Sequence, residues 1–388
     1  MSFETNQEKE MLRSICQELG VPNLVEVLAE TPLRRLQPLL INAWKKRVKS
    51  RKPAELLAEY GSKNEFYGVS SIPQDALHEF ARICFSSVPP EFDIVQTSPI
   101  EPVGLNAVLS KVSQNNTLST IRGSEVVSDV ASQLALECAH RRKNLLVMTG
   151  QHSCEVVNLS STGRVLRLQP FDAKKGYMQH FNLFALCSGG RNSNSAGGFA
   201  VPYLCTHMDV LLTAIDKLRE NGYPLNCISL QLSDMRFLEE LIAVKTLPKD
   251  EILRNSLNDD FDLFSKYGIE FPREAANAAS LNKETFQSSG MPDRTKYFSR
   301  LEQNIFAPLK SKHPNVSYHF DFTRKSGLGY YQHLCFHIFA KDRNGRVVQI
   351  ADGGAVDWLT KLLGNRREAM VTSGIGAELT QKLFSPRM

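Results

Sequence analysis

The order of strands and glycines in the last seventy residues constrains the fold of this chain more than any other feature. Short apolar or alternating runs typical of strands occupy 316–322, 331–340, 346–351 and 369–373. Glycine pairs flank them at 327 and 329, 353 and 354, and 374 and 376. Glycine permits backbone angles and close approaches that other residues do not. The pairs indicate turns or strand ends that meet around a ligand.

Polar side chains at these strand ends suit an anionic or zwitterionic ligand. Arg324 offers a planar guanidinium that matches a carboxylate or a phosphate. Tyr330 and Tyr331 are adjacent, so in a strand they would face opposite sides, and at most one would line a given pocket. The segment from Ser373 to Leu379 leads from a strand end into a helix, whose free N–H groups suit an anion.

Composition places the chain among soluble globular proteins. Its 388 residues are 42% hydrophobic and 22% charged, and the net charge is +5. The eight cysteines lack metal-knuckle spacing and lie partly in apolar runs, which is typical of buried thiols in a reducing compartment. The polar N-terminus is no secretory signal, and no apolar run approaches the ~20 residues of a membrane span. These features predict a cytoplasmic protein.

Residues 1–88 are predicted to form a helical unit. Helical spacing of apolar residues covers Asn6–Leu19, and further helices are expected from Pro32, over Pro53–Tyr60 and over Pro73–Phe85. The second helix ends in a basic cluster at 45–52. That cluster is interpreted either as a solvated helix face or as an RNA contact.

Residues 89–388 mix strands and helices without strict alternation, which predicts an α+β domain with an antiparallel sheet. Residues 234–312 read as a mostly helical insertion, and 188–198 as a Gly/Ser/Asn-rich loop. Further helices are expected at 124–142, 208–220, 355–363 and from 376. Further strands are expected at 92–96, 144–149, 154–159, 164–168 and 227–232, with a turn at 161–163 and another apolar run at 178–187.

With these motifs in place, the sequence resembles the class II aminoacyl-tRNA synthetase core of the histidyl type, a group that includes the regulatory subunit of ATP phosphoribosyltransferase. The resemblance rests on Arg324 with Gly327-Leu-Gly-Tyr-Tyr331, on Gly353-Gly354 with Asp357, and on Gly374-Ile-Gly-Ala-Glu378. It implies an antiparallel sheet flanked by helices and a homodimer. The chain ends just after the third motif, so the anticodon-binding domain is expected to be absent.

Fainter matches lie upstream in the same order. Ile121-Arg-Gly-Ser-Glu125 is similar to the family's leucine–arginine–proline–glutamate segment, and Thr97-Ser-Pro-Ile-Glu101 to the proline-bearing dimer motif. Leu166-Arg-Leu-Gln169 is similar to the phenylalanine–arginine–x–glutamate of motif 2, with its return from Gly176 onward. The resemblance therefore implies catalytic roles for Arg167 and Arg324. It implies ligand binding by Arg122, Glu125, Gln169, Gln179, Tyr330, Tyr331, Gln332, Gly353, Gly354, Gly374, Gly376 and Glu378.

Several departures from the family's motifs affect the predicted ability to activate an amino acid. The family's motif 3 arginine, which grips the nucleotide, is replaced by Leu379, and the second motif 2 arginine falls near Gln179. Leu183 and Cys187 stand where the family holds the amino acid with a glutamine and a glutamate. A leucine cannot replace a bidentate guanidinium, nor a cysteine a carboxylate. Losing one such donor typically costs ~3 kcal/mol in a reacting site, so ordinary histidine activation should stop.

Two functional hypotheses follow. In the first, the chain is a paralogue that does not charge tRNA, acts as a regulatory or partner-binding subunit, and keeps a remnant pocket for an amino acid or nucleotide. In the second, it is an ATP-dependent ligase or aminoacyl transferase that adenylates an acid for an acceptor other than tRNA. ATP with magnesium is the cofactor that the resemblance implies.

Two further site types find little support in the sequence. His333 and His337 would share one strand face, but no third metal ligand is evident, so no metal site is expected. Ser195 has no base near it in the sequence, so a serine nucleophile is unsupported.

Overall fold

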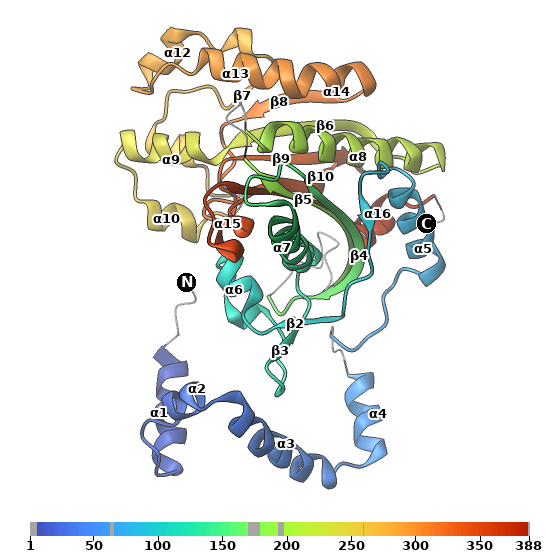
Figure 1. Ribbon diagram of the computed structural model, residues 1–388, viewed down its shortest axis with the longest axis vertical. Helices are drawn as coiled ribbons and strands as arrows, with labels where there is room; N and C mark the ends of the chain where they lie inside the picture. The colour runs from blue at the N-terminus through green and yellow to red at the C-terminus, as the bar shows by residue number, and fades with distance from the viewer. Residues whose placement is uncertain (1–5, 63–65, 170–178, 193–197, 259, 387–388) are drawn as a thin grey trace.

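The computed structural model describes residues 6–62, 66–169, 179–192, 198–258 and 260–386. Its centre is a nine-stranded sheet (Figure 1). The strand order is β1 (Asp93–Ile94), β4 (Val157–Leu166), β5 (His180–Arg191), β11 (Glu368–Gly376), β10 (Val347–Val356), β9 (Leu334–Lys341), β6 (Asn226–Asp234), β8 (Ser317–Asp321) and β7 (Glu274–Ala275).

The sheet is mostly antiparallel, as the sequence predicts, with parallel pairs only where β1 meets β4 and β6 meets β8. Two details differ from the sequence prediction. The expected turn at 161–163 lies inside β4, which runs unbroken because all ten of its residues pair with β5. The start of the expected loop at 188–198 belongs to β5, where Ser188 to Arg191 pair with β11.

Helices cover both faces of the sheet. One face carries α8 (Ala200–Glu220), with α5 (Gln74–Phe85) and α16 (Ala377–Phe384) packed beside it. The other carries α7 (Val130–Thr149), with α15 (Trp358–Leu363) and α6 (Leu105–Ser110) against it. Beside α6 lie the short helix η1 (Gln114–Asn116) and the two-stranded ribbon of β2 (Ile100–Pro102) and β3 (Ser124–Val126). This layered α+β arrangement confirms the predicted fold class.

Helix α7 begins six residues later than the sequence predicts. Ser124–Val126 pairs with β2 instead, and the Asp129 side chain accepts a 2.9 Å hydrogen bond from the Ala131 N–H as the N-cap of α7. The predicted strand at 144–149 is wrong, because these residues complete α7. Their apolar pattern misled the prediction, since Val147 and Met148 are in fact largely exposed.

The segment from 235 to 312, where the sequence predicts a helical insertion, consists mostly of short helices and contributes to an aromatic cluster. Phe237 lies within 6.5 Å of Phe271, Phe286, Phe298 and Phe322, measured between ring centroids. The insertion contains α9 (Met235–Val244), α10 (Lys249–Arg254), α11 (Leu263–Tyr267), β7, η3 (Ala278–Ser280), α12 (Lys283–Ser288), α13 (Thr295–Leu301), η4 (Glu302–Phe306) and α14 (Ala307–Lys312).

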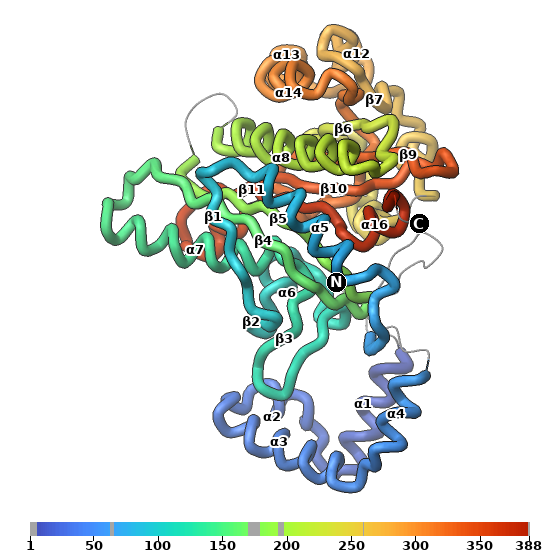
Figure 2. Tube along the Cα trace, turned by 90° about the vertical axis from the view of Figure 1, so that its right-hand side faces the viewer, coloured from blue at the N-terminus to red at the C-terminus, as the bar shows by residue number. Residues whose placement is uncertain are grey.

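The N-terminal helices project from this body as a separate arm (Figure 2). The arm consists of α1 (Asn6–Glu18), α2 (Leu24–Glu30), α3 (Leu33–Lys49) and α4 (Pro53–Gly61). Within these four helices only Cys16 is buried. By contrast α5, which the sequence groups with them, buries Phe80 and Ile83 and contacts α8 and α16. In the described part of the chain, no helix combines the length and hydropathy that a membrane crossing requires.

His313 fastens the end of the insertion to α8. Its Nδ1 lies 2.7 Å from Asp216 and its Nε2 lies 3.0 Å from Asp209, and Lys312 also contacts Asp209 at 2.6 Å. Burial lowers the pKa of His313, but the hydrogen bonds and charges of the two carboxylates outweigh burial, so the net pKa lies above its usual 6.5. The imidazolium therefore joins α14 to α8 by two charge-assisted contacts.

This contact predicts a pH-dependent effect of the His313→Gln substitution. Because the folded pKa is raised, the charged histidine stabilises fully below about pH 6.5, and the contribution is lost as pH rises through the folded pKa. We expect the variant to lose about 1–2 kcal/mol of unfolding free energy at pH 5.5 and less at pH 8.5. Urea unfolding at both pH values measures this. Exposed His78→Gln is the matched control, and equal losses at both pH values would contradict the prediction.

Candidate functional site

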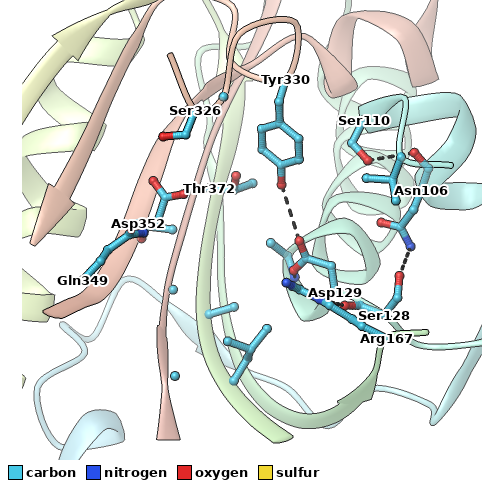
Figure 3. A pocket seen from close by; sticks show the side chains of 18 of the residues that line it. Asn106, Ser110, Ser128, Asp129, Arg167, Ser326, Tyr330, Gln349, Asp352 and Thr372 are labelled. Atoms are coloured by element: carbon cyan, nitrogen blue, oxygen red, sulfur yellow. Dashed lines mark hydrogen bonds between the residues drawn. The ribbon is translucent and has the colours of Figure 1, made fainter. Parts of the chain in front are cut away.

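A cavity of about 670 Å³ lies on the α7 side of the sheet, beside the N-terminus of that helix (Figure 3). Its floor is the central part of β5, β10 and β11, and its walls come from the C-terminal end of α6, the segment at 326–331 and the residues that follow β4. Antiparallel strands from distant parts of the sequence thus end around one space. The kind of cleft that the glycine pattern predicts is present.

Asp129 brings a half-buried carboxylate to the lining of this cavity. One of its oxygens caps α7, and the other accepts a 3.4 Å hydrogen bond from the Tyr330 hydroxyl. Burial, with Asp129 nearby, raises the pKa of Tyr330 well above its usual 10, so the phenol stays a neutral donor. Asn106 lies next to them and donates to the Ser128 hydroxyl at 2.8 Å. These groups suit an ammonium or another hydrogen-bond donor.

Arg167 brings a fixed cation to the same end of the cavity. Its Nε donates to the Ser128 carbonyl at 2.9 Å, and its guanidinium lies 5.2 Å from the centre of the Phe181 ring. The backbone N–H of Arg167 donates to the backbone carbonyl of Gln179, and Gln179 is buried. Among described residues, the Arg167 side chain forms no ion pair. The guanidinium is therefore held in place while its terminal nitrogens are left for a ligand anion.

Arg324 lies behind the wall and does not line the cavity. Its Nη2 donates to Asp352 at 2.9 Å and its Nε to the Ser326 carbonyl, while the guanidinium packs 5.3 Å from the Tyr331 ring centre. The side chain is almost fully buried. Asp352 and Ser326 do line the cavity. Arg324 therefore holds Asp352 and Tyr331 in position from behind the wall.

Tyr330 and Tyr331 both line the cavity, which corrects the prediction that at most one could. That prediction assumed a strand, whereas the segment turns before β9 begins, and the Tyr330 and Tyr331 N–H groups bond the Gly327 carbonyl. Because Gly327 and Gly329 have positive φ angles, this turn depends on glycine. The two rings meet edge to face with centroids 4.8 Å apart.

His337 lies at the other end of the cavity, where Gln349 and Thr372 also line the wall. Burial, and to a lesser degree Arg324, lowers the pKa of His337 to about 3. The imidazole is therefore neutral at physiological pH and offers hydrogen bonds without charge. His333, which the sequence places on the same strand, precedes β9 instead.

Glu378 and Leu379 form the wall next to β11. The Glu378 carboxylate is already neutralised by Arg164 at 2.7 Å and by the backbone N–H of Asn182. Leu379 presents only an apolar side chain to the cavity. This wall therefore has no free cation where the resemblance predicts the nucleotide.

The glycine pairs next to the cavity mainly create packing space. A Cβ on Gly354 would lie 2.4 Å from the Tyr331 ring, and one on Gly353 would lie 2.4 Å from the Ser373 Cβ and 2.6 Å from Phe336. A Cβ on Gly374 would meet the Phe184 carbonyl at 2.8 Å. These glycines let two strands and an aromatic ring pack closely, while Gly376 has open space around it.

The structure brings about half of the predicted site residues together. Seven line the cavity: Arg167, Gln169, Tyr330, Tyr331, Gly374, Gly376 and Glu378. Four lie just behind it: Gln179, Arg324, Gly353 and Gly354. Three lie elsewhere: Arg122, Glu125 and Gln332.

Two of the three residues that lie away from the cavity were predicted from the fainter upstream match. Arg122 is exposed in the turn directly before β3, and Glu125 is buried in β3, where it accepts a hydrogen bond from the Gly104 N–H at 2.9 Å. Gln332 is exposed beside the turn before β9. In this upstream part of the chain, the acidic residue that lines the cavity is Asp129, which sequence reasoning missed. Its signal was a Ser-Asp pair directly before an apolar helical run, a typical N-cap.

The departures on β5 are also explained by the structure. Leu183 lines the cavity, so an apolar wall replaces the expected polar contact. Cys187 is fully buried against Cys138, and burial raises the pKa of its thiol well above 9. It therefore neither contacts a ligand nor acts as a nucleophile.

The strand order, together with a cavity whose floor is the sheet, defines a class II aminoacyl-tRNA synthetase-like fold. Similar solved structures belong to the histidyl type. An ATP phosphoribosyltransferase regulatory subunit/histidyl-tRNA synthetase from Bacillus halodurans has 13% identity and a TM-score of 0.58, with 83% of each chain covered.

Two further structures agree. Histidyl-tRNA synthetase from Nostoc sp. has 14% identity and a TM-score of 0.55, with 82% of this chain and 74% of that chain covered. A histidine–tRNA ligase subunit from Alicyclobacillus acidocaldarius has 14% identity and a TM-score of 0.54, with 81% of this chain and 96% of that chain covered. No protein-family model matches the sequence, and a search of curated proteins finds no match either. These likenesses establish the fold.

Proposed function

We propose that the chain does not charge tRNA, that it binds a free amino acid in the cavity beside α7, and that it acts as a regulatory or partner-binding subunit. The observation that carries this proposal is that Arg167 lines the same cavity as Asp129 and Tyr330, whose side chains are hydrogen-bonded to each other. A fixed cation beside a carboxylate matches the carboxylate and ammonium of an amino acid.

The balance of charge around the cavity supports an amino acid over ATP. Among described lining residues, the cations are Arg167 and Lys111, while the carboxylates of Asp352 and Glu378 are already paired with Arg324 and Arg164. A triphosphate carries several negative charges and needs a surplus of cationic donors. Leu379 in the wall and the pairing of Glu378 with Arg164 add no such donor. The described lining residues therefore do not fit ATP with magnesium.

The fold supports the regulatory part of the proposal. One similar structure is named an ATP phosphoribosyltransferase regulatory subunit/histidyl-tRNA synthetase, so a regulatory role is one of the two roles that its name gives. By that analogy we propose a protein partner and a homodimer in the cytoplasm for this chain as well. The partner would sense whether an amino acid fills the cavity.

Amino-acid binding and pyrophosphate exchange together test the proposal. We expect thermal stabilisation of the purified protein by one or a few free amino acids at millimolar concentration, and no exchange of labelled pyrophosphate into ATP. Exchange with any amino or carboxylic acid would overturn it in favour of the second candidate, an adenylating ligase or aminoacyl transferase. Absence of both binding and exchange would also refute it.

A further inference from the structure

The cavity beside α7 has a second group of polar side chains, at the end away from Asp129. Four residues make up this polar end: Ser326, His337, Gln349 and Thr372. In Figure 3 the labelled residues of the polar end lie on one side of Tyr330, and Arg167 lies on the other. An amino acid held at Arg167 by its carboxylate and at Asp129 by its ammonium therefore has only its side chain left for the polar end.

Three neighbouring strands bring the polar end together. His337 of β9 pairs directly opposite Asp352 of β10, and Asp352 is opposite Gly374 of β11. Because side chains two residues apart on a strand share a face, Thr372 points to the same side of the sheet as His337. A register shift directly after Gln349 brings that residue to the same side as well.

The four side chains of the polar end form no hydrogen bond to any described residue. His337 and Thr372 are nevertheless only 7% and 2% exposed. The nearest approach joins His337 Nε2 to an Asp352 oxygen at 3.8 Å, which is too long for a hydrogen bond. Buried polar groups are normally hydrogen-bonded, and an unmade bond is costly. Four unpartnered groups that face one space therefore point to a ligand that supplies their partners.

The polar end carries no uncompensated charge. Asp352 beside it accepts a 2.9 Å hydrogen bond from Arg324, so these two charges offset each other. Burial, with Arg324 nearby, lowers the pKa of His337 to about 3, so the imidazole is neutral. A charged ligand side chain would be buried here without a counter-charge, at a large desolvation cost. An apolar one would leave the four polar groups unpaired. An uncharged polar side chain avoids both costs.

We propose, building on the amino-acid binding proposed above, that the bound amino acid carries a primary carboxamide side chain, as glutamine and asparagine do, and that His337, Gln349 and Thr372 select it. A primary carboxamide offers two N–H donors and an oxygen with two lone pairs, which makes four hydrogen-bonding positions. A hydroxyl offers three and a neutral imidazole two. The carboxamide therefore satisfies more of the unpartnered groups than these alternatives.

Isosteric amino acids test the proposal. Glutamine, glutamate and methionine have side chains of similar length and shape but differ in charge and polarity, and asparagine, aspartate and leucine form a second such set. Isothermal titration of the full-length protein with each amino acid at neutral pH measures the affinities. We expect glutamine or asparagine to bind at least about 10-fold more tightly than the other two members of its set, and more tightly than serine or histidine.

Two near-isosteric substitutions test whether the polar end makes the selection. Thr372→Val and Gln349→Met each remove hydrogen-bonding groups with little change of shape. Each should weaken binding of the carboxamide amino acid by roughly 5- to 20-fold, while affinity for its apolar isostere stays the same or rises. Retained binding of the apolar isostere also shows that the variant is folded. Gln287→Met is the matched control, because Gln287 is exposed on α12 outside the cavity, and it should leave every affinity unchanged.

The possible outcomes separate this proposal from the amino-acid site on which it rests. Binding of no amino acid at all would refute both. Binding that ignores the side chain, or that favours a charged, apolar, hydroxyl or imidazole side chain, would overturn the carboxamide proposal and leave the amino-acid site in place. A carboxamide preference that neither Thr372→Val nor Gln349→Met reduces would likewise overturn it.

Discussion

Replacing Arg142 with methionine should lower the free energy of unfolding by about 3–5 kcal/mol. Arg142 of α7 and Glu368 at the start of β11 are completely buried, with Nε 2.7 Å from one carboxylate oxygen and Nη2 3.1 Å from the other. Arg142 also donates to the carbonyls of Ser153 and Glu155. The variant leaves the Glu368 charge buried without its partner and leaves two carbonyls without their donor. Urea unfolding measures the loss.

The neighbouring residue provides a matched control. Arg141 pairs with Glu137 and Asp93 but is about one-third exposed, so Arg141→Met should cost less than about 1 kcal/mol. Replacing both buried partners, Arg142→Met with Glu368→Leu, should cost less than Arg142→Met alone because no charge is left behind. Equal losses of unfolding free energy for the Arg141 and Arg142 substitutions would contradict the prediction that the buried ion pair stabilises the contact between α7 and β11.

Replacing Arg167 with alanine should weaken amino-acid binding by roughly 10- to 150-fold, the range for a lost hydrogen bond to a charged group of about 1.5–3 kcal/mol. The guanidinium is the cation that the structure fixes beside Asp129, and it is preorganised by the Ser128 carbonyl and Phe181. The effect should fall on affinity, since Arg167 lies at the edge of the sheet. Isothermal titration with the amino acid that stabilises the wild type measures the change.

Arg122→Ala distinguishes the cavity from the upstream sequence match. The resemblance gives Arg122 a ligand-binding role, whereas the structure places it exposed in the turn directly before β3. Amino-acid affinity should therefore stay within about threefold of wild type in this variant, a difference of about 0.6 kcal/mol. A large loss for Arg122→Ala with none for Arg167→Ala would reverse the assignment of the site.

Residues with fixed local roles were predictable from the sequence. Gly327 and Gly329 adopt positive φ angles, and the glycine pattern predicted the turn that they form. The motif around Arg167 directly follows the long strand β4, and its spacing predicted the position of Arg167. The same holds for the insertion, whose helical periodicity depends on local spacing. Asp129 was missed although its N-cap signal was local, because the match at Glu125 drew attention four residues upstream.

Contacts between distant segments were not predictable from the sequence. Arg324 looked like a ligand contact, but Asp352 of β10 holds it behind the wall. Glu378 looked free, but Arg164 of β4, 214 residues earlier, neutralises it. A guanidinium or a carboxylate reads the same in a sequence whether it is free or paired, and only the register of the strands decides which partner comes within hydrogen-bonding distance.

The sequence by itself determined the α+β class and the glycine-dependent turn before β9, because periodicity and glycine act over a few residues. The tertiary structure decided which charges remain for a ligand. It left Arg167 and Asp129 facing one cavity, placed Leu379 in the wall and moved Arg122 to the surface beside α3. Which charged side chains remain unpaired depends on contacts between residues far apart in the chain, and a linear pattern of residues does not show these contacts.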